Sequence, residues 1–234
     1  MKQTRGYINR TLLILMPLLF MSVGMANDIY VTQSGDTLDL DITQDGQNNT
    51  VGNSTTSSSS VGATTTLNID QIGNSNVITY AINGATYSGV INLVGNSNNV
   101  DLNCDSTGGN SSCGTANAVI NFTGSSNDID LDIGQTSSAA TADVDIVGQS
   151  GSDSNVVAAT VDGNSAILTI TVNGDTNNWL IDIDGNGDVN GHTLIHTHTG
   201  GIADVDIVQS GINDQYINLT TSGDNHDIDI SQTD

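Results

Sequence analysis

The amino-acid sequence predicts an all-β protein, a β-solenoid of stacked strand-turn-strand rungs. Two nearly identical segments, residues 142–151 and 203–211, each contain an alternating strand followed by Gln-x-Gly. Glycines recur at intervals of 11 or 12 residues, and apolar residues alternate with polar residues between them. Such alternation, bounded by Gly and Asn, is typical of half-buried strands. Because single copies of a repeat bury little apolar surface, the copies are expected to stack.

The glycine interval sets the size of one rung. A strand of five or six residues and a turn fill one interval, so two intervals, about 22 residues, make one rung. Stacked rungs lie about 4.8 Å apart, as in amyloid-like cross-β structure. We therefore expect roughly eight rungs and a rod on the order of 40 Å long.

Residues 1–26 are typical of a secretory signal peptide, because Lys2, Arg5 and Arg10 precede a short apolar run. That run is too short for a comfortable membrane span. These three residues are the only Lys and Arg, whereas all 26 acidic residues are Asp. We expect an exported bacterial chain starting near Asn27. Its acidity excludes nucleic acid and disfavours anionic membranes as partners, because both require Lys and Arg.

The repeat divides the chain into segments. Residues 27–50 are expected to form an N-terminal strand pair or first rung, and residues 51–66 a Ser/Thr-rich loop or linker. Residues 67–234 are expected to form the main solenoid, with an insertion at 104–117. Cys104 and Cys113 bound this insertion, and in an exported chain they are predicted to form a disulfide, two free thiols being the alternative.

The motif Gln-x-Gly-x-x-Asn occurs at residues 44–49 and 71–76, and partial copies recur along the chain. Its Gln and Asn side chains are expected to form ladders with their equivalents in neighbouring rungs. The motif resembles the curlin repeat of curli fimbriae, the bacterial surface amyloid. The residues that carry this resemblance, and that we expect in the ladders, are Gln33, Gly35, Gln44, Gly46, Asn49, Gln71, Gly73, Asn76, Gly95, Asn98, Gly124, Asn127, Gln149, Gly151, Gly174, Asn177, Gln209 and Gly211.

The resemblance implies a subunit that is exported by a Sec signal, passes an outer-membrane channel and polymerises at the cell surface. Its expected partners are further copies of itself and other curlin-like subunits or a nucleator. The fibre would serve adhesion, cell aggregation and the biofilm matrix. No catalysis is expected, because the sequence offers no Glu and no catalytic spacing.

Two sets of residues are candidate metal ligands. Asp182, Asp184, Asn186 and Asp188 resemble the start of an EF-hand loop, but Thr193 replaces the bidentate Glu, so a plain solenoid corner is favoured over a weak calcium site. His196 and His198, preceded by His192, form a His-x-His pair that is expected to face solvent.

Asp residues flank the inward aliphatic residues and are therefore expected to face solvent. Carboxylates in successive rungs repel by just under ~1 kcal/mol per pair in water. We favour a solvated face that restrains premature association inside the cell; the alternative is assembly assisted by protons, salt or Ca²⁺ as a counter-ion. No other cofactor is expected.

The alternative function is a monomeric solenoid, either a calcium-dependent adhesin module or an ice-binding protein. Regular Thr-x-Thr rows would favour ice binding, but residues 169–171 and 197–199 read as isolated pairs.

Overall fold

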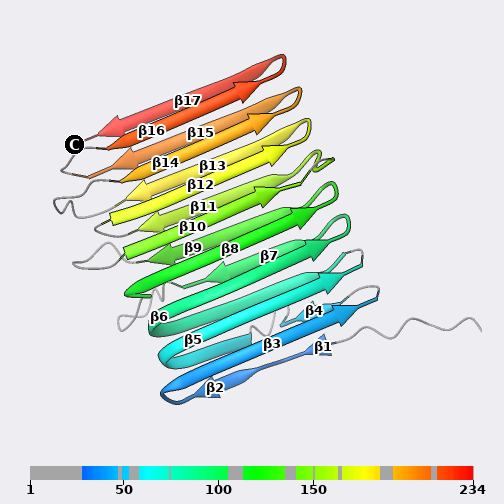
Figure 1. Cartoon of the computed structure of the whole chain (residues 1–234), viewed down its shortest axis with the longest axis vertical. Coiled ribbons are helices and arrows are strands. Elements are labelled where there is room, and N and C mark those ends of the chain that lie inside the picture. Colours follow the sequence, from blue (N-terminus) through cyan, green and yellow to red (C-terminus); the bar gives the residue numbers. More distant parts are fainter. Residues whose placement is uncertain are drawn as a thin grey trace, which may run out of the picture.

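The computed structural model describes residues 28–46, 49–52, 58–73, 75–104, 113–134, 141–149, 151–162, 165–184, 192–211 and 215–233. Every regular element in these ranges is a β-strand, and every strand pairing among them is parallel. The strands stack as a β-solenoid, as predicted (Figure 1).

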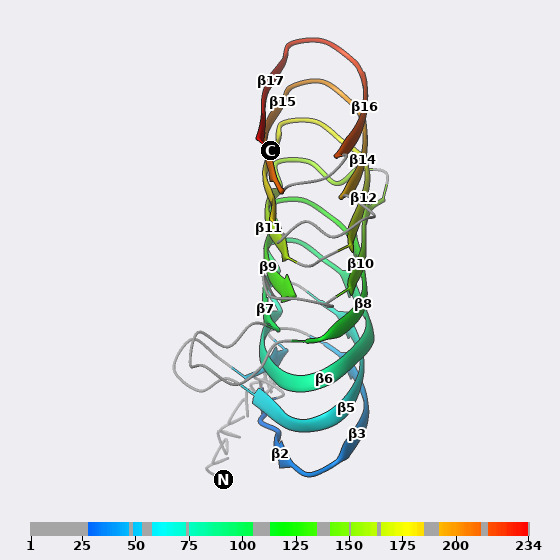
Figure 2. The same cartoon turned by 90° about the vertical axis from the view of Figure 1, so that its left-hand side faces the viewer.

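The solenoid has two faces, seen edge-on as two rows of strands in Figure 2. The β17 face contains β1 (Asp28–Ile29), β2 (Thr32–Ser34), β4 (Thr50–Val51), β7 (Asn99–Asn103), β9 (Asp128–Gly134), β11 (Val156–Asp162), β13 (Asn177–Asp184), β15 (Ala203–Ser210) and β17 (His226–Thr233). The β16 face contains β3 (Thr37–Asp45), β8 (Thr115–Thr123), β10 (Thr141–Gly148), β12 (Ser165–Asn173), β14 (Thr193–Thr199) and β16 (Tyr216–Ser222). The long strands β5 (Ser58–Ile72) and β6 (Val77–Val94) curve from the β17 face to the β16 face.

One turn of the solenoid takes 22 to 29 residues, roughly 26 on average, instead of the uniform 22 predicted. Asp28 pairs with Thr50, and Val77 with Asn99, each at the predicted separation of 22. Asn99 pairs with Asp128 at 29, because the Cys-bounded insertion lies between them. We call each strand position along the stack a level. On the β17 face the described chain has nine levels, and one column of paired residues passes through all of them: Asp28, Thr50, Val77, Asn99, Asp128, Val156, Asn178, Asp204 and Asp227.

The alternation of the sequence becomes columns of side chains that run along the stack. One inward column on the β16 face begins at Ile42 and continues through five further isoleucines before reaching His196 and Leu219. The isoleucines from Ile69 to Ile170 are fully buried. Burying each stabilises the fold by about 1.5–3 kcal/mol, so these columns form the core.

The glycine interval has a steric cause at one corner, between the β16 face and the next strand of the β17 face. A Cβ at Gly124 would overlap the carbonyl oxygen of Gly95 one level below, and one at Gly73 would overlap that of Gly46. The residue that precedes the inward Asn adopts a left-handed conformation and is mostly Ser, for example Ser126 with φ 60°. The Gly-x-x-Asn spacing therefore follows from a corner in which backbones of successive turns nearly touch.

Replacing Gly124 by Ala is expected to destabilise the fold by about 2–4 kcal/mol, because both overlap and strain at φ +120° oppose it. Gly151→Ala is the matched control: its φ is +83°, but no atom lies within 4 Å of the added Cβ. We expect it to cost only about 1 kcal/mol. Urea unfolding followed by circular dichroism measures both; equal losses would refute the overlap.

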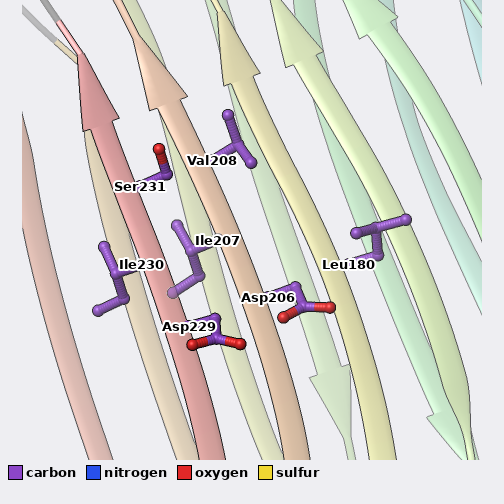
Figure 3. Close-up of a pocket in the computed structure, with 7 residues that line it drawn as sticks. All are labelled: Leu180, Asp206, Ile207, Val208, Asp229, Ile230 and Ser231. Atoms are coloured by element: carbon purple, nitrogen blue, oxygen red, sulfur yellow. The ribbon is translucent and has the colours of Figure 1, made fainter.

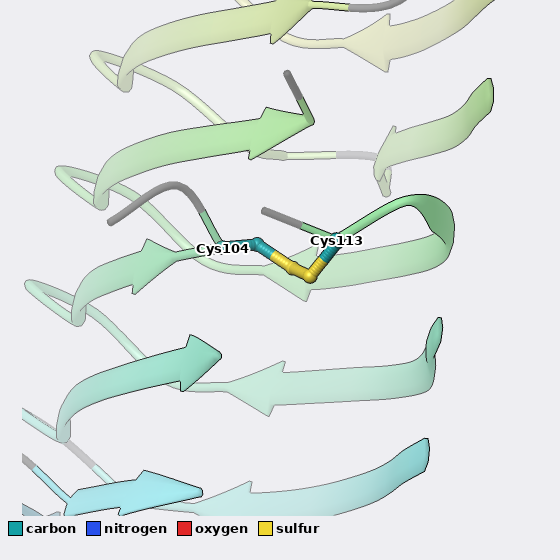
Figure 4. Close-up of a disulfide and its surroundings, with 2 residues drawn as sticks. All are labelled: Cys104 and Cys113. Carbon is teal, nitrogen blue, oxygen red and sulfur yellow. A yellow bond between two sulfur atoms is a disulfide. The ribbon is translucent and has the colours of Figure 1, made fainter. Parts of the chain in front are cut away.

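Two predicted segment boundaries are wrong. Residues 58–66, predicted as a loop or linker, belong to β5, because Thr64–Thr66 take up register with β3 and β6. The first rung is therefore continuous with the main solenoid. Residues 115–117, assigned to the insertion, already belong to β8. Cys104 and Cys113 form the predicted disulfide, with Cα atoms 5.6 Å apart at the base of the insertion (Figure 4).

Candidate functional site

A ladder of buried Asn side chains runs along one corner of the solenoid. From Asn49 to Asn155, the backbone N–H of each ladder Asn donates to the Oδ1 of the Asn one level above, at 2.9 to 3.2 Å. The Nδ2 of Asn98 and of Asn155 also donate to the Oδ1 above. The members are Asn49, Asn76, Asn98, Asn127, Asn155 and Asn177, all at most 2% exposed.

The Asn ladder stops at Asn177. The next two levels carry Ala203 and His226 at its position. The Nδ2 of Asn177, like that of Asn76, has no hydrogen-bond partner. In the copy of the motif that begins at Gln149, Asn155 stands one residue later than the Asn of the other copies. It is nevertheless in register, because Ser152 takes the corner position expected for Gly151. A one-residue insertion thus leaves the ladder intact.

The Gln residues form short pairs instead of a continuous ladder. The Nε2 of Gln71 donates to Oε1 of Gln44 at 2.7 Å, and that of Gln232 donates to Oε1 of Gln209 at 2.9 Å. Beyond Gln71 its column carries Leu93, Phe122, Gly148, Val172 and His198, and below Gln209 the other column carries Ile133, Val161 and Ile183. Gln149 is exposed, and Gln33 donates weakly to the carbonyl of Thr37. Glutamine therefore marks the two ends of the described solenoid.

Outward Asp residues are often paired with an outward Asn of the adjacent level. Asn68 donates to Asp41 at 2.8 Å, and Asn92 donates to Asp70 at 2.6 Å. Asn103 donates to Asp132 at 3.3 Å. The amide satisfies the carboxylate without adding charge, so these positions avoid the rung-to-rung repulsion expected from the sequence.

Asp residues of adjacent levels lie in register at four positions of the described chain. Asp101 lies beside Asp130 and Asp162 beside Asp184, and towards the C-terminal end Asp204 and Asp206 lie beside Asp227 and Asp229. Burial, reinforced by Asp101 and then Asp128, raises the pKa of Asp130. Figure 3 shows Asp206 and Asp229 side by side on neighbouring strands, in a shallow hollow with the exposed apolar Leu180 and Val208.

Removing the stacked pair with Asp206→Asn and Asp229→Asn is expected to stabilise the fold by roughly 0.5–1 kcal/mol. The control, Asp143→Asn with Asp145→Asn, removes the same charge where the flanking levels carry Asn117, Ile167, Val119 and Thr169. Urea unfolding at low salt compares the two variants. Salt near 1 M should abolish their difference, because it screens exposed charges; a difference that persists there contradicts a Coulombic cause.

The prediction that the histidines face solvent is wrong. His192, His196 and His198 are at most 2% exposed. His196 and His198 share the inward parity of Leu194 in β14, a pattern that was already visible in the sequence. The rings extend the columns of Ile170 and Val172, so they occupy core positions.

The buried imidazoles form a cluster in the last levels of the core. The ring of His196 meets Trp179 edge-to-face with centroids 5.1 Å apart, and His198 meets His226 at 5.3 Å. No ring nitrogen of His196 or His198 has a hydrogen-bond partner. Burial, and then His198, lowers the pKa of His196 to about 3. Burial and His226 also lower the pKa of His198, against the opposing charge of Asp175. Both rings are therefore neutral at pH 7.

Outward hydroxyls also form columns on the β16 face, which sequence reasoning missed. One column contains Thr37, Thr64, Thr86, Thr115, Thr141 and Ser165. A second contains Thr171, Thr197 and Thr220. The two Thr-x-Thr pairs that looked isolated in the sequence thus meet at one position, Thr171 beside Thr197, whereas Thr169 lies beside Ile195 and Thr199 beside Asn173.

The core is open at both ends of the described solenoid. At the C-terminal end Ile217, Leu219 and Ile228 are half-buried and Ile230 is 48% exposed, whereas Leu194 and Ile207 one level below are at most 1% exposed. At the other end Ile29, Leu38 and Leu40 are also only partly buried. In the described chain the backbone of β17 takes up register with β15 alone, so its other edge is unpaired there.

The candidate calcium ligands cannot be placed as a site: Asp182 is exposed on β13, and residues 185–191 lie outside the described ranges. Among the described residues, no three His, Cys, Asp or Glu side chains form a group able to hold a metal ion. The same part of the chain contains no helix long and apolar enough to cross a membrane. Comparison with family models, curated proteins and solved structures found no match.

Proposed function

We propose that the chain is a secreted structural subunit of a curli-like extracellular amyloid fibre, which grows by stacking one solenoid on the end of another. The fibre serves adhesion, cell aggregation and the biofilm matrix at a bacterial surface. The curlin-like motif suggests passage through an outer-membrane channel and growth with further curlin-like subunits or a nucleator.

The observation that carries the proposal is the open core at β16 and β17. Apolar side chains that are fully buried one level below remain partly exposed there, and the adjoining backbone edge is unpaired within the described chain. A second copy would bury both, because its strands present the same alternation. The described chain has no Pro or Lys that would block such pairing.

Electron microscopy and thioflavin fluorescence of the purified chain without residues 1–26 test the proposal at micromolar concentration. We expect unbranched fibres, and seeding by preformed fibres that shortens the lag. Replacing Ile228 and Ile230 by Lys should prevent growth while leaving the monomer folded. Persistent monomers of the unmodified chain, with or without calcium and between pH 7 and pH 4, would refute the function.

A second candidate function, ice binding, is favoured by one observation, the in-register Thr columns on the β16 face. A regular array of hydroxyl and methyl groups on a stiff sheet suits an ordered layer of water. Thermal hysteresis of the unmodified chain tests it. Thr197→Lys should remove the hysteresis, whereas Thr160→Lys on the β17 face should not; no hysteresis in the unmodified chain rejects this candidate.

A further inference from the structure

The two ends of the described solenoid carry strands of the same design. Residues 28–34 read Asp-Ile-Tyr-Val-Thr-Gln-Ser, and residues 227–233 read Asp-Ile-Asp-Ile-Ser-Gln-Thr. Both have Asp, Ile and Gln at the same places, an aliphatic residue at the fourth and hydroxyls at the fifth and seventh. The registers put Asp28 and Asp227 in one column, eight levels apart. The two segments therefore share the same inward side-chain pattern, although the first is divided into β1 and β2 and carries Tyr30 where the second carries Asp229.

The two faces differ by one level. In the described chain β17 extends the β17 face beyond β16, the last strand of the β16 face, while residues 28–34 and β3 lie together in the first turn. If residues 28–34 of a second copy stacked on β17, its β3 would lie about 9.6 Å from β16, two strand spacings away. Ile217 and Leu219 would then remain open inside the fibre.

We propose that copies join by strand exchange, in which β17 of one copy takes the place of residues 28–34 in the next copy. This inference rests on the proposed fibre and specifies its joint. Residues 28–34 leave their position, and β16 then pairs directly with β3 of the next copy. No level of either face stays empty.

The register of this joint follows from the columns. Leu40 and Ile217 end one inward column, and Ile42 and Leu219 end the next, so apolar residues meet across the joint. In the outward column between them, Asn218 meets Asp41, the same amide–carboxylate pairing that Asn68 makes with Asp41 at 2.8 Å. On the other face Asp227 takes the place of Asp28 opposite Thr50.

The exchange also leaves the joint with more backbone pairing than it removes. Residues 28–34 contribute only the two-residue β1 and the three-residue β2, which β17 replaces with equivalent pairing. The joint then adds the pairing of the seven-residue β16 with β3. Gly35 and Asp36, which separate β2 from β3, are the hinge about which residues 28–34 swing out.

Engineered disulfides distinguish exchange from simple stacking. A pair in adjacent levels meets the Cα separation of about 4.4–6.8 Å that a disulfide needs, whereas a pair two levels apart does not. Asp41→Cys with Asn218→Cys reports the exchange, and Asp28→Cys with Asp227→Cys reports simple stacking. All four positions are exposed, and within one molecule each pair lies seven or eight levels apart, so any bond joins two copies.

After oxidation of grown fibres, non-reducing gels should show covalent multimers for the first pair and monomers for the second. Multimers from the second pair alone, or from neither pair, would overturn the exchange while fibres still form. Absence of fibres from the unmodified chain would instead overturn the proposed function.

Deleting residues 28–34 provides a second test, because exchange and simple stacking predict opposite changes in the assembly lag. Exchange predicts a shorter assembly lag, because the position for β17 is already empty. Simple stacking predicts slower assembly, because the deletion removes the strand that would meet β17. A longer lag with a folded monomer therefore contradicts the exchange.

Discussion

Acidification is expected to loosen the levels formed by β13 to β17, and His196→Ile is expected to remove most of that effect. The pKa of His196 is about 3 in the fold, below its ordinary value of 6.5. Because the pKa is lower in the fold than in the unfolded chain, the unfolded chain binds the proton first as the pH falls. The free energy of unfolding is therefore unaffected above pH 6.5 and decreases below it. The loss is about 1.4 kcal/mol per pH unit, or roughly 2 kcal/mol at pH 5.

Isoleucine is the matched replacement because the column already carries Ile170 below His196 and Leu219 above it. The charged or titratable groups near the cluster are His198 on the same strand, His226 from β17, and Asp175 in the turn before β13. Relief of carboxylate repulsion at Asp130, whose pKa is raised, changes stability in the opposite direction on acidification.

Fluorescence of Trp179, the only Trp of the chain, reports this cluster directly because its ring contacts His196. Urea unfolding followed at this residue should give a midpoint that falls with pH in the unmodified chain and much less in His196→Ile. Equal pH dependence in the two proteins would show that the carboxylates, not the imidazoles, determine acid stability.

Asn127→Ala is expected to cost roughly 3–5 kcal/mol, the largest effect of any polar substitution in the ladder. The Oδ1 of Asn127 accepts from both the backbone N and the Nδ2 of Asn98, and its own Nδ2 donates to the carbonyl of Gly124 at 2.9 Å. Truncation leaves these buried donors and acceptors without hydrogen-bond partners, and each unpaired group lowers the stability by about 1–3 kcal/mol.

The matched control is Asn121→Ala, six residues earlier in the chain. Its Nδ2 donates to Asn92 at 2.8 Å, but the pair is half-buried on the outer surface, where water replaces the bond. We expect a loss below about 1 kcal/mol. Thermal unfolding compares the two variants; similar losses would mean that the buried ladder adds nothing beyond ordinary packing.

Much of the fold is predictable from local pattern. Period-2 alternation assigned strands such as residues 128–133, and the Gly-x-x-Asn spacing located the corner of Asn98 and Asn127. Such features are readable because each depends on residues within one turn. The strand in the Ser/Thr-rich segment could not be predicted from local pattern, since its register with β3 and β6 comes from residues more than 20 positions away in the sequence.

The sequence by itself determined the solenoid, the inward aliphatic columns, the outward Asp residues and the ladder corners. Tertiary structure decided which outward residues meet, because insertions of different length change the advance per turn from 22 to 29 residues. That variation brings Asp206 beside Asp229 and aligns Thr171 with Thr197. The tertiary structure also decided that the two faces end one level apart, since that depends on register across whole turns. The core position of His196, in contrast, follows from its parity with Leu194 within one strand.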